Sequence, residues 1–458
     1  MVVVIGAGLA GSEAALQIAS RGVPVELWEM RPSRMTEAHT SGRSAELVCS
    51  NSFGSTSPHS SSSILKEELS VLGASILEVA RQFAVPAGAS LAVDRELFSQ
   101  RVTDLLAAHP LISRETGEIR EIPKDRISII ATGPLTSPDL AQHLTQKVGQ
   151  DSLYFYDAIS PIVSAESLDL EQMYFANRYD KGETKDFLNI PLTQEQYDTL
   201  VEDLLMGDVV LPHNFEEEKY FEACMPIEAL ASRGRQTLAF GPMKPVGLNN
   251  PRDGKRPYAV IQLRAENQYK TAYNLVGFQT KLKYKEQERI FRKLPGLGQA
   301  EFLRLGSMHR NTYLHSPRTL LPTLQLKCDP NILVAGQLTG TEGYLESTAT
   351  GWLAAWNAVR LHQGLELSYP PAKTMLGALT RAITDPARVD FQPMNSNMGV
   401  LPPLETRQKD KKLRNAALSE RSQSEVKSWW KSVNEAKLLS VQPCDGRVDP
   451  ERPAPIFS

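Results

Sequence analysis

The sequence predicts an α/β protein in which a parallel-sheet domain is interrupted by an inserted α+β domain. Three observations lead to this expectation. The chain opens with a strand, a glycine-rich turn and a helix in immediate succession. A buried strand followed by a glycine-rich segment and a helix appears again near residue 331. Between them, from 186 to 327, short strands alternate with turns, which is typical of a separate α+β unit.

Residues 1–29 have the pattern of a β-α-β unit. Val2–Ile5 is an uninterrupted apolar run, as in a strand buried on both faces. Ser12–Ser20 reads as a helix, and Val23–Trp28 as the second strand. Glu29 follows directly, where a carboxylate accepts hydrogen bonds from a ribose hydroxyl. This order predicts a Rossmann-type nucleotide site at the start of the chain.

Glycines at three positions of the first turn give that site its physical basis. Gly6 permits the tight turn, Gly8 lets the backbone approach a pyrophosphate, and Gly11 lets helix and strand pack closely. The free N–H groups and positive dipole end of the helix then face the phosphates. We therefore expect a dinucleotide to lie against the residues of this turn, Gly6, Ala7, Gly8, Leu9, Ala10 and Gly11.

A long polar segment, 30–63, separates this unit from the next helices. It is rich in serine and lacks periodicity, which is typical of a functional or disordered loop. Apolar residues from Leu65 to Phe83 recur every three or four positions and predict one amphipathic helix, and Asp94 is suited to cap another. Ile127–Ile130 reads as a buried strand that ends in Thr132-Gly133, where the backbone again comes close to a ligand.

The central part of the chain has a different texture. Thr193 and Gln196 form a capping box that opens a helix. Tyr258–Leu263 and Asn274–Lys283 have the composition of strands and are separated by turn residues. This mixture of short strands and turns predicts the inserted α+β domain.

The last strand restores the parallel-sheet pattern. Asn331–Ala335 reads as a buried strand, and the glycine-rich segment after it leads into the helix Ala349–Leu361. A nicotinamide enzyme needs only the first turn, whereas a late helix N-terminus suits the negative charge of a reduced flavin. Gly296 and Gly298 lack a third glycine and a preceding strand, so they form an ordinary turn. FAD is therefore the expected tight cofactor, with further contacts from Thr132, Gly133, Gly336, Gln337, Gly343 and Tyr344.

The C-terminal tail is polar and starts with a basic stretch. It contains Trp429 and Trp430, so we expect a helix in part of it and disorder from 443 to 458. The expected parts of the chain are the first part of the FAD-binding domain (1–185), the insertion domain (186–327), the second part of the FAD-binding domain (328–405) and the tail (406–458).

Composition excludes several classes of function. With 41% hydrophobic residues, 22% charged residues and a net charge of −3, the chain is an ordinary globular protein, so any nucleic-acid site is a local basic patch. No apolar run approaches the length that crosses a bilayer, and we expect no membrane partner. The cysteines are too dispersed for a disulfide framework or a metal site, which indicates reduced thiols in a cytoplasm and no metal. They are Cys49, Cys224, Cys328 and Cys444. We also expect a monomer or weak oligomer.

Stretches along nearly the whole chain match one family. They include ELVCSNS around Cys49, PAGASLAVDR, KYFEACMPIEALASRGRQTLAFGPMKPVG around Cys224, MHRNT, and the glycine-rich segment 336–351. On these stretches the chain resembles the folate- and FAD-dependent tRNA (uracil-5-)-methyltransferases of bacteria. The resemblance implies a glutathione-reductase-like FAD-binding Rossmann domain interrupted by one inserted α+β domain. The serine-rich loop 53–63 and the tail beyond Lys431 depart from the family pattern.

The resemblance also implies the reaction. Members methylate C5 of a uridine in the tRNA T-loop to form 5-methyluridine. The carbon comes from 5,10-methylenetetrahydrofolate, and reduced FAD, regenerated by NADH or NADPH, is the reductant. C5 of uracil is a poor nucleophile until a thiolate adds to C6. The resemblance implies that Cys49 and Cys224 are catalytic; we assign Cys224 as the C6 nucleophile and Cys49 as its partner near the flavin, and the reverse assignment stays open.

An RNA substrate needs a basic surface, and the insertion domain offers one. Lys281, Lys283 and Lys285 alternate, so on a strand they share one face. Such a face can hold phosphates while the target uridine is flipped toward the flavin. For any single lysine, a solvated charged face is the alternative, and for His309 a packed core position. A second candidate set for contacts with folate or RNA is His309, Arg310 and Asn311.

Two other functions are consistent with the same residues. One is an FAD-dependent oxidoreductase of a small molecule, in which the basic patch is incidental. The other is a flavin-bound RNA-binding protein without methyl transfer. The basic insertion domain argues against the first, and the pair Cys49 and Cys224 against the second. Formation of 5-methyluridine in T-loop RNA distinguishes the three.

Overall fold

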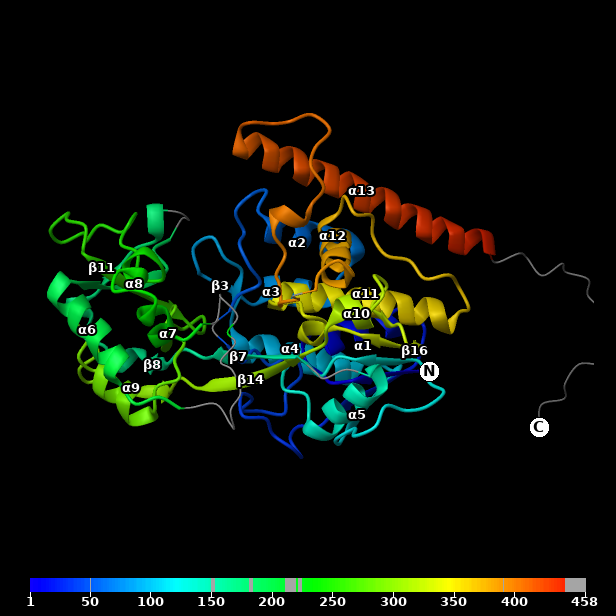
Figure 1. Ribbon diagram of the computed structural model, residues 1–458, viewed down its shortest axis with the longest axis horizontal. Coiled ribbons are helices and arrows are strands. Elements are labelled where there is room, and N and C mark those ends of the chain that lie inside the picture. Colours follow the sequence, from blue (N-terminus) through cyan, green and yellow to red (C-terminus); the bar gives the residue numbers. More distant parts are fainter. Residues whose placement is uncertain are drawn as a thin grey trace, which may run out of the picture.

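The computed structural model describes residues 1–49, 51–149, 153–180, 184–210, 220, 225–389 and 391–440. The chain forms two domains, each built on a six-stranded sheet, with a long helix lying across the top of the larger one (Figure 1). We call the domain on the first sheet the FAD domain and the domain on the second sheet the insertion domain.

In the sheet of the FAD domain, β1 lies between β6 and β2. All neighbouring strands of this sheet pair in parallel except β15, which runs antiparallel to β16 at one edge. The carboxyl ends of the parallel strands therefore meet at one edge of the sheet, which confirms the predicted Rossmann-type fold. In spatial order the strands are β15 (Gln325–Leu326), β16 (Asp329–Val334), β6 (Ser128–Ile130), β1 (Val2–Ile5), β2 (Val25–Glu29) and β5 (Ile112–Thr116).

Helices cover both faces of this sheet. Val2 and Val4 pack with the helices on one face, and Val3 and Ile5 with those on the other, because successive side chains of a strand point to opposite faces. The first face is covered by α1 (Leu9–Ala19), α2 (Ser61–Leu72), α3 (Ser75–Gln82), α4 (Arg95–Ala108), α11 (Tyr344–His362) and α12 (Met375–Thr384). On the other side lies α5 (Pro138–Val148). The short α10 (Ser316–Thr319) contacts α12. A small hairpin, β3 (Ala84–Val85) and β4 (Ala92–Val93), precedes α4.

The amphipathic segment that the sequence predicts as one helix forms two, α2 and α3. Gly73 ends α2 with the left-handed conformation φ 73°, ψ 42°, and the chain changes direction before α3 starts. The single-helix prediction was wrong because the apolar spacing continues across this break. The predicted cap is confirmed: the Asp94 side chain accepts a hydrogen bond from Leu97 N at the start of α4.

The sheet of the insertion domain is antiparallel throughout. Its strands run from Ile162 to Arg304, so the boundary predicted at residue 186 falls inside it. β8 and β9 lie before that boundary but belong to the same sheet. β8 pairs with β12, more than one hundred residues later, and β9 pairs with β10. No local pattern records the long-range pairing of β8. The spatial order is β13 (Phe302–Arg304), β8 (Ile162–Ser164), β12 (Ala272–Leu275), β11 (Ala259–Ala265), β10 (Phe187–Leu192) and β9 (Tyr174–Phe175).

The helices of the insertion domain pack on this sheet around a core of their own. The predicted capping box is confirmed, since Thr193 accepts from Gln196 N and the Gln196 side chain accepts from Thr193 N. The helices are α6 (Gln194–Met206), α7 (Ile227–Ser232), α8 (Thr237–Phe240) and α9 (Tyr284–Phe291).

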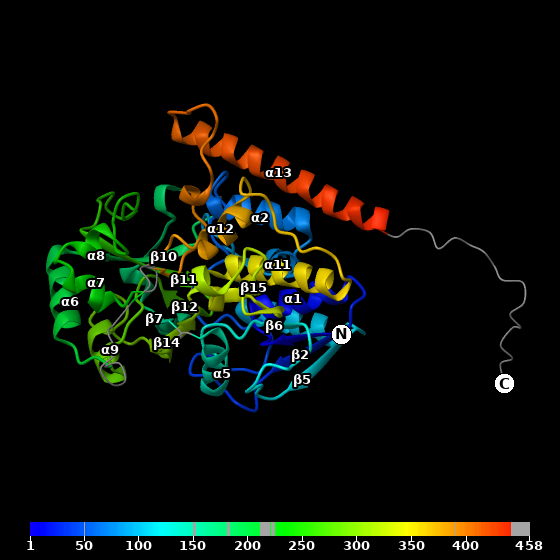
Figure 2. The ribbon, with the colours of Figure 1, turned by 45° about the vertical axis from the view of Figure 1, so that its right-hand side comes forward.

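Two long strands join the domains. β7 (Leu153–Ala158) and β14 (Met308–Tyr313) pair antiparallel along their whole length and run between the two domains in both views (Figures 1 and 2). At the FAD-domain end, Thr312 N donates to Pro134 O and Leu314 N to Leu338 O. These contacts attach the linking strands to the loops that follow β6 and β16.

The tail contains the expected helix, α13 (Lys411–Ser440), which packs on α2 (Figure 1). Its Trp430 ring lies 5.5 Å from that of Trp352 and 5.0 Å from that of Trp356, both on α11. The Arg21 guanidinium lies 5.9 Å from the Trp430 ring. The stretch predicted as disordered, 443–458, lies outside the described residues. No helix of the described ranges is long and apolar enough to cross a membrane.

Candidate active site

A cleft lies at the carboxyl-end edge of the FAD-domain sheet, with about 1050 Å³ of empty space out to its mouth. It opens where β1 meets β2 on one side and β6 on the other. Open parallel sheets bind ligands at such a switch point. Most of the cofactor residues predicted from sequence line the cleft: Gly6, Gly8, Leu9, Ala10, Glu29, Thr132, Gly133, Gly336, Gln337 and Tyr344.

The glycine turn after β1 shows which of its residues the protein itself requires. Gly6 has a φ of 99°, and a Cβ there would lie 2.6 Å from Ala131 O. A Cβ on Gly11 would lie 1.8 Å from Gly6 O. At Gly8, in contrast, a Cβ would meet nothing within 4 Å. Packing therefore demands glycine at the first and third positions, whereas Gly8 presents bare backbone to the cleft.

Helix α1 begins at this bare position. Gly8 is its N-cap residue with a φ of −70°, and no side chain of the described residues caps the helix. The first N–H groups of a helix need acceptors, and its positive dipole end attracts anions. An open space of this kind fits the pyrophosphate of FAD, as the sequence predicts.

Three predicted cofactor residues do not line the cleft. Ala7 donates its N–H to Glu29 Oε2 at 2.9 Å, and Gly11 packs against Gly6. Gly343 is the N-cap residue of α11 and has a φ of 118°. Their roles in this structure are to shape the turns that bear the lining residues, which a motif alone does not separate from ligand contact.

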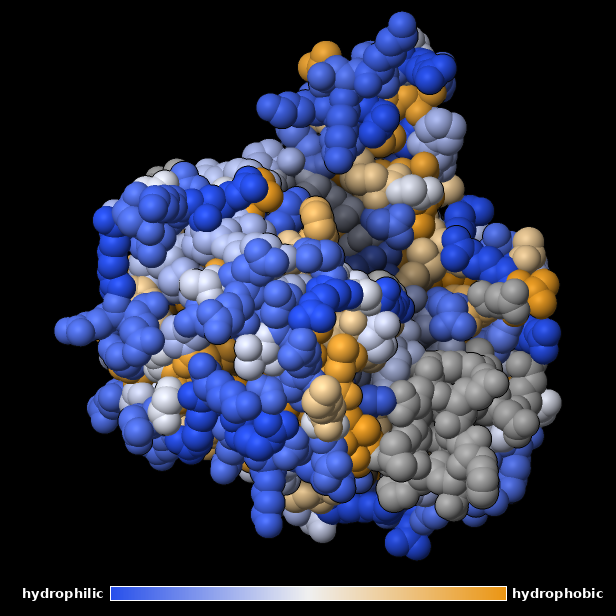
Figure 3. Space-filling model, turned by 60° about the vertical axis from the view of Figure 1, so that its left-hand side comes forward, coloured by the Kyte–Doolittle hydropathy of each residue, from blue (hydrophilic) through white to orange (hydrophobic). Residues whose placement is uncertain are grey.

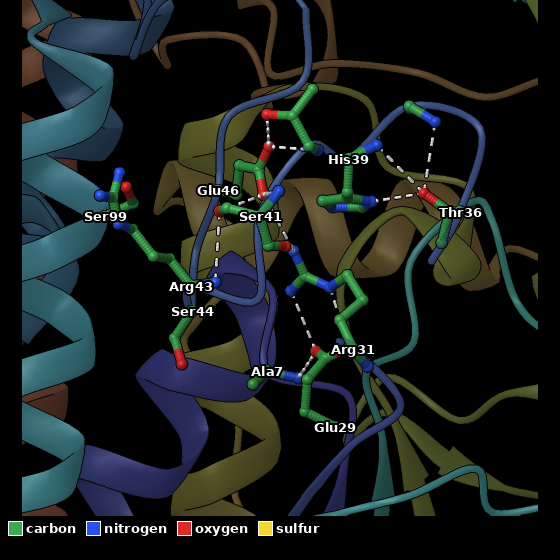
Figure 4. A network of polar contacts seen from close by, with 12 residues as sticks. Ala7, Glu29, Arg31, Thr36, His39, Ser41, Arg43, Ser44, Glu46 and Ser99 are labelled. Atoms are coloured by element: carbon green, nitrogen blue, oxygen red, sulfur yellow. Dashed lines mark hydrogen bonds and ion pairs between the residues drawn. The ribbon is translucent and has the colours of Figure 1, made fainter. Parts of the chain in front are cut away.

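Glu29 has partners within the protein (Figure 4). Its Oε1 accepts hydrogen bonds from Arg31 N at 3.0 Å and from Arg31 Nε at 2.9 Å. Burial acts to raise the pKa of Glu29, but hydrogen bonds and charge from Arg31 outweigh it and hold that pKa below its usual value. The carboxylate is therefore ionised and fixed. Its contact with a ribose hydroxyl stays a prediction.

Arg31 extends this network to groups that the sequence analysis missed (Figure 4). Its Nη1 lies 3.3 Å from Glu46 Oε2. His39 Nδ1 lies 2.6 Å from Thr36 Oγ1, and both residues line the cleft. Burial, followed by the charge of Arg31, lowers the pKa of His39 to about 4, so its ring is neutral at pH 7. These residues lie in the polar segment after β2, where no periodic pattern marks a buried side chain.

Cys49 lies beside the cleft, on the same polar segment. Its Sγ is 3.0 Å from the hydroxyl oxygen of Tyr344. That hydroxyl also accepts from Cys49 N at 3.2 Å and donates to Cys49 O at 2.8 Å. Burial and negative charge at Cys49 raise the pKa of Tyr344 well above its ordinary value, so the hydroxyl stays protonated. Because the Tyr344 ring lines the cleft, the half-buried thiol is held at the wall of the expected cofactor site.

A smaller polar cavity of about 260 Å³ lies where the two domains meet, and Tyr344 lines it as well. Arg95 comes from the FAD domain, and Arg264 and Glu266 come from the insertion domain. Arg95 Nε lies 2.9 Å from Glu266 Oε2. Burial acts to lower the pKa of Arg95, but Glu266, Tyr344 and Cys49 together raise it. No sequence pattern marks this junction, because its residues lie far apart along the chain.

The three candidate lysines do not share the face of a strand. β12 ends at Leu275, and Gly277, with a φ of 78°, turns the chain. Lys281 precedes an isolated bridge, Lys283 is the N-cap residue of α9, and Lys285 lies in that helix. The prediction of a strand reaching residue 283 was therefore wrong, and the alternation has no common face. Lys283 and Lys285 are exposed on the insertion domain.

The surface of the insertion domain pairs many of its cations. Asp203 binds both Arg289, at 2.9 Å from Nη1, and Lys293, at 2.8 Å from Nζ. Arg235 pairs in the same way with two carboxylates of α6. In the view that has the insertion domain in front, the surface is predominantly hydrophilic with short hydrophobic stripes (Figure 3). Exposed pairs of this kind are weak, so they remain open to competition from phosphates.

The remaining candidates stand as follows. Cys224 lies outside the described residues, and so do the side chains of His309 and Arg310. The backbone of these two residues pairs with β7. Asn311 is 3% exposed, so its side chain faces the interior. Among the described residues, no three His, Cys, Asp or Glu side chains gather as a metal site would require.

Comparison with known proteins identifies close relatives. A family model described as GIDA, glucose inhibited division protein A, matches residues 1–366. The methylenetetrahydrofolate–tRNA-(uracil-5-)-methyltransferase TrmFO of Dictyoglomus thermophilum is 53% identical over 422 residues, which are 92% of this chain and 96% of the relative. The protein of the same name from Pelobacter propionicus is 54% identical over 441 residues, covering 96% of this chain and 97% of the relative.

A solved structure supports the fold. GidA of Aquifex aeolicus, in its form I crystal, aligns with a TM-score of 0.66 at 18% identity. The match covers 96% of this chain and 79% of that one, and the form II crystal gives a TM-score of 0.64. At this identity the likeness shows the fold alone.

Proposed function

The chain belongs to the TrmFO family of methylenetetrahydrofolate–tRNA-(uracil-5-)-methyltransferases, and from this premise we propose how its residues carry out the reaction. The protein methylates C5 of uracil in tRNA and takes the carbon from methylenetetrahydrofolate. Its cleft binds FAD. The finer statements are that the uridine lies in the T-loop and that NADH or NADPH is the reductant.

The observation that carries the proposal is the position of Cys49. Its thiol is 3.0 Å from the hydroxyl of Tyr344, whose ring lines the cleft. A cysteine in a polar loop at the wall of a cofactor cleft is placed to act on a substrate held there.

The cleft residues explain how FAD is held. Gly8 and the N-terminus of α1 would hold the pyrophosphate, and the turns at Gly133 and Gly336 and the ring of Tyr344 would hold the rest of the cofactor. When bound, FAD supplies hydride, which reduces a one-carbon unit at the formaldehyde level to a methyl group. The protein residues supply binding, orientation and proton transfer.

Two thiols divide the work on the uracil ring. Cys224 adds as a thiolate to C6, and the electron pair that this releases makes C5 nucleophilic toward the one-carbon unit. Cys49 accepts the proton that leaves C5, and the electron pair of that C–H bond expels the carrier of the one-carbon unit and leaves a methylene on C5. Hydride addition to this methylene then drives departure of the Cys224 thiolate from C6, which restores the C5–C6 double bond. The same bonds form and break if Cys49 is the nucleophile and Cys224 the base, and the adduct experiment below distinguishes these two assignments.

The test is direct. The purified holoenzyme is incubated with T-loop RNA, methylenetetrahydrofolate and either NADH or NADPH, and 5-methyluridine is measured by mass spectrometry of nucleosides. We expect product with one or both nicotinamides. FAD and RNA binding without any 5-methyluridine would contradict the proposal, and nicotinamide oxidation by small molecules alone would favour a different oxidoreductase.

The thiols are tested with RNA that carries 5-fluorouridine, which traps the C6 adduct. We expect Cys224→Ala to retain FAD and form no adduct, whereas Cys49→Ala forms it. Cys328→Ala is the matched control, because Cys328 is exposed next to the start of β16. Adduct formation by Cys224→Ala but not by Cys49→Ala would reverse the assignment.

A further inference from the structure

The segment that carries Cys49 has no regular secondary structure and depends on contacts from elsewhere. It lies between β2 and α2. The FAD domain holds it through the hydroxyl of Tyr344 and through Lys66, whose Nζ donates to Phe53 O and Ser55 O, both at 2.8 Å. These contacts hold the main chain at Cys49 and at residues 53–55.

The insertion domain also holds the segment that carries Cys49. Arg304 of β13 donates from Nη1 to Val48 O at 3.2 Å and from Nη2 to Ala38 O at 3.1 Å. Arg264 of β11 donates from Nη2 to Asn51 O at 3.4 Å. Val48 O and Asn51 O lie just before and just after Cys49, and Ala38 O lies earlier in the same segment. A planar guanidinium can bridge two such carbonyls at once, which an ammonium group does less well.

These arginines also bring positive charge to the thiol. Arg264 is 9% exposed, and burial is the largest cause that lowers the pKa of Arg264 and of Arg304. Placing two guanidiniums here therefore costs free energy, and negative charge at Cys49 is among the influences that offset the cost. The charged and titratable groups that face this region are Arg95, Arg264, Arg304, Glu46, Glu266 and Tyr344.

We infer that Arg264 and Arg304 are positioning residues for Cys49, which hold the thiol against Tyr344 and favour its thiolate form. The inference rests on the proposed catalytic role of Cys49. It makes the placement of the insertion domain a condition for the chemistry in the FAD domain, because both arginines belong to the insertion sheet. Contacts of RNA with the insertion domain then act on the thiol through these two side chains.

The experiment measures alkylation of Cys49 by iodoacetamide as a function of pH, in the full-length holoenzyme, by mass spectrometry of the Cys49 peptide. Exposed Cys328 is the internal reference. We expect Arg304→Gln and Arg264→Gln each to move the midpoint of Cys49 alkylation about 0.5–1 pH unit upward and to slow it about 3- to 10-fold at pH 7. The kcat for 5-methyluridine should fall, while the KM for tRNA changes little.

A matched control comes from the same domain. Arg252 also donates to main-chain carbonyls, at 3.1 Å to Leu170 O and 2.8 Å to Met173 O, but these belong to the insertion domain itself. We expect Arg252→Gln to leave the alkylation profile of Cys49 unchanged. Arg304→Lys keeps the positive charge but loses the planar guanidinium that binds two carbonyls at once. It should therefore keep the midpoint of Cys49 alkylation near that of the wild type and still lower kcat.

The outcomes are distinguishable. Wild-type midpoints and wild-type kcat in all three variants of Arg264 and Arg304 would overturn the inference. If a glutamine variant fails to fold or to retain FAD, Arg304→Lys decides, and an unchanged kcat there counts against positioning. If the midpoints shift as expected while wild-type enzyme makes no 5-methyluridine, the proposed function fails and the control of the thiol by the two arginines stands.

Discussion

Replacement of Gly8 by alanine separates cofactor binding from folding more sharply than any other change in the cleft. A Cβ at Gly8 meets nothing within 4 Å, and its φ of −70° suits any residue. The loss of N-cap preference and the gain from a stiffer unfolded chain are both below about 1 kcal/mol and have opposite signs. The apoprotein should therefore keep its stability to within about 1 kcal/mol.

In the proposed binding mode, the same methyl group projects into the space of the FAD pyrophosphate. If it costs one hydrogen bond to a charged group, about 1.5–3 kcal/mol of binding free energy is lost. At 1.4 kcal/mol per tenfold, the Kd for FAD should rise about 10- to 150-fold. Quenching of flavin fluorescence on titration of the apoprotein measures the Kd, and thermal unfolding of the apoprotein measures stability.

Two further glycines calibrate this result. Gly11→Ala places a Cβ 1.8 Å from Gly6 O, so the backbone must move and the apoprotein should lose about 1–3 kcal/mol or more. Gly298→Ala, in the turn that the sequence analysis set aside, meets its nearest neighbour at 3.8 Å and should change neither quantity. An unchanged Kd for FAD in Gly8→Ala, or a loss of apoprotein stability as large as that of Gly11→Ala, would refute the reasoning.

Three other predictions follow. Tyr344→Phe keeps the ring at the cleft but removes the three contacts of the hydroxyl with Cys49. Because a hydrogen bond is worth about 1 kcal/mol, we expect a kcat at least about tenfold lower, with a Kd for FAD within about threefold of wild type. Trp430→Ala should lower the free energy of unfolding by up to about 3 kcal/mol in urea titrations, because the half-buried ring packs α13 on α11. Folding lowers the pKa of His39 from 6.5 to about 4, so between these pH values the unfolded state binds one more proton, and stability is lost as pH falls from 6.5 to 4. Thermal unfolding of His39→Gln should show a smaller loss of stability across that range.

The features that local chemistry dictates were predictable from the sequence. The first β-α-β unit, the cap at Asp94 and the capping box at Thr193 all depend on residues within a few positions of one another. The three glycine-bearing strand ends converge because parallel strands share an edge, which is a general property of such sheets. Hence the three glycine-bearing turns that line the cleft could be named before the fold was known.

The features that depend on contacts between distant residues were not predictable from the sequence. Gly73 breaks a helix whose apolar spacing continues unbroken, and β8 belongs to a sheet whose other members come later in the chain. Arg31, two residues past Glu29, lies in a segment without periodicity, and its burial depends on how that segment folds back over the cleft. The alternating lysines predicted a shared face of one strand, but the chain turns at Gly277 before it reaches them. In each case the missing information is a contact between residues far apart, which no window of the sequence contains.

Tyr344 joins the two halves of the site in a way that constrains both. Its ring lines the cleft, its hydroxyl binds Cys49 on the N–H and the carbonyl side, and it also borders the cavity where the domains meet. A ring that contacts cofactor cannot shift without moving the main chain of Cys49, because both hydrogen bonds end on backbone atoms. Arg304 holds that backbone from the opposite side and from the other domain. The thiol is therefore fixed only when the cleft and the insertion domain are both in place, which allows a segment without secondary structure to present a reactive group in one position.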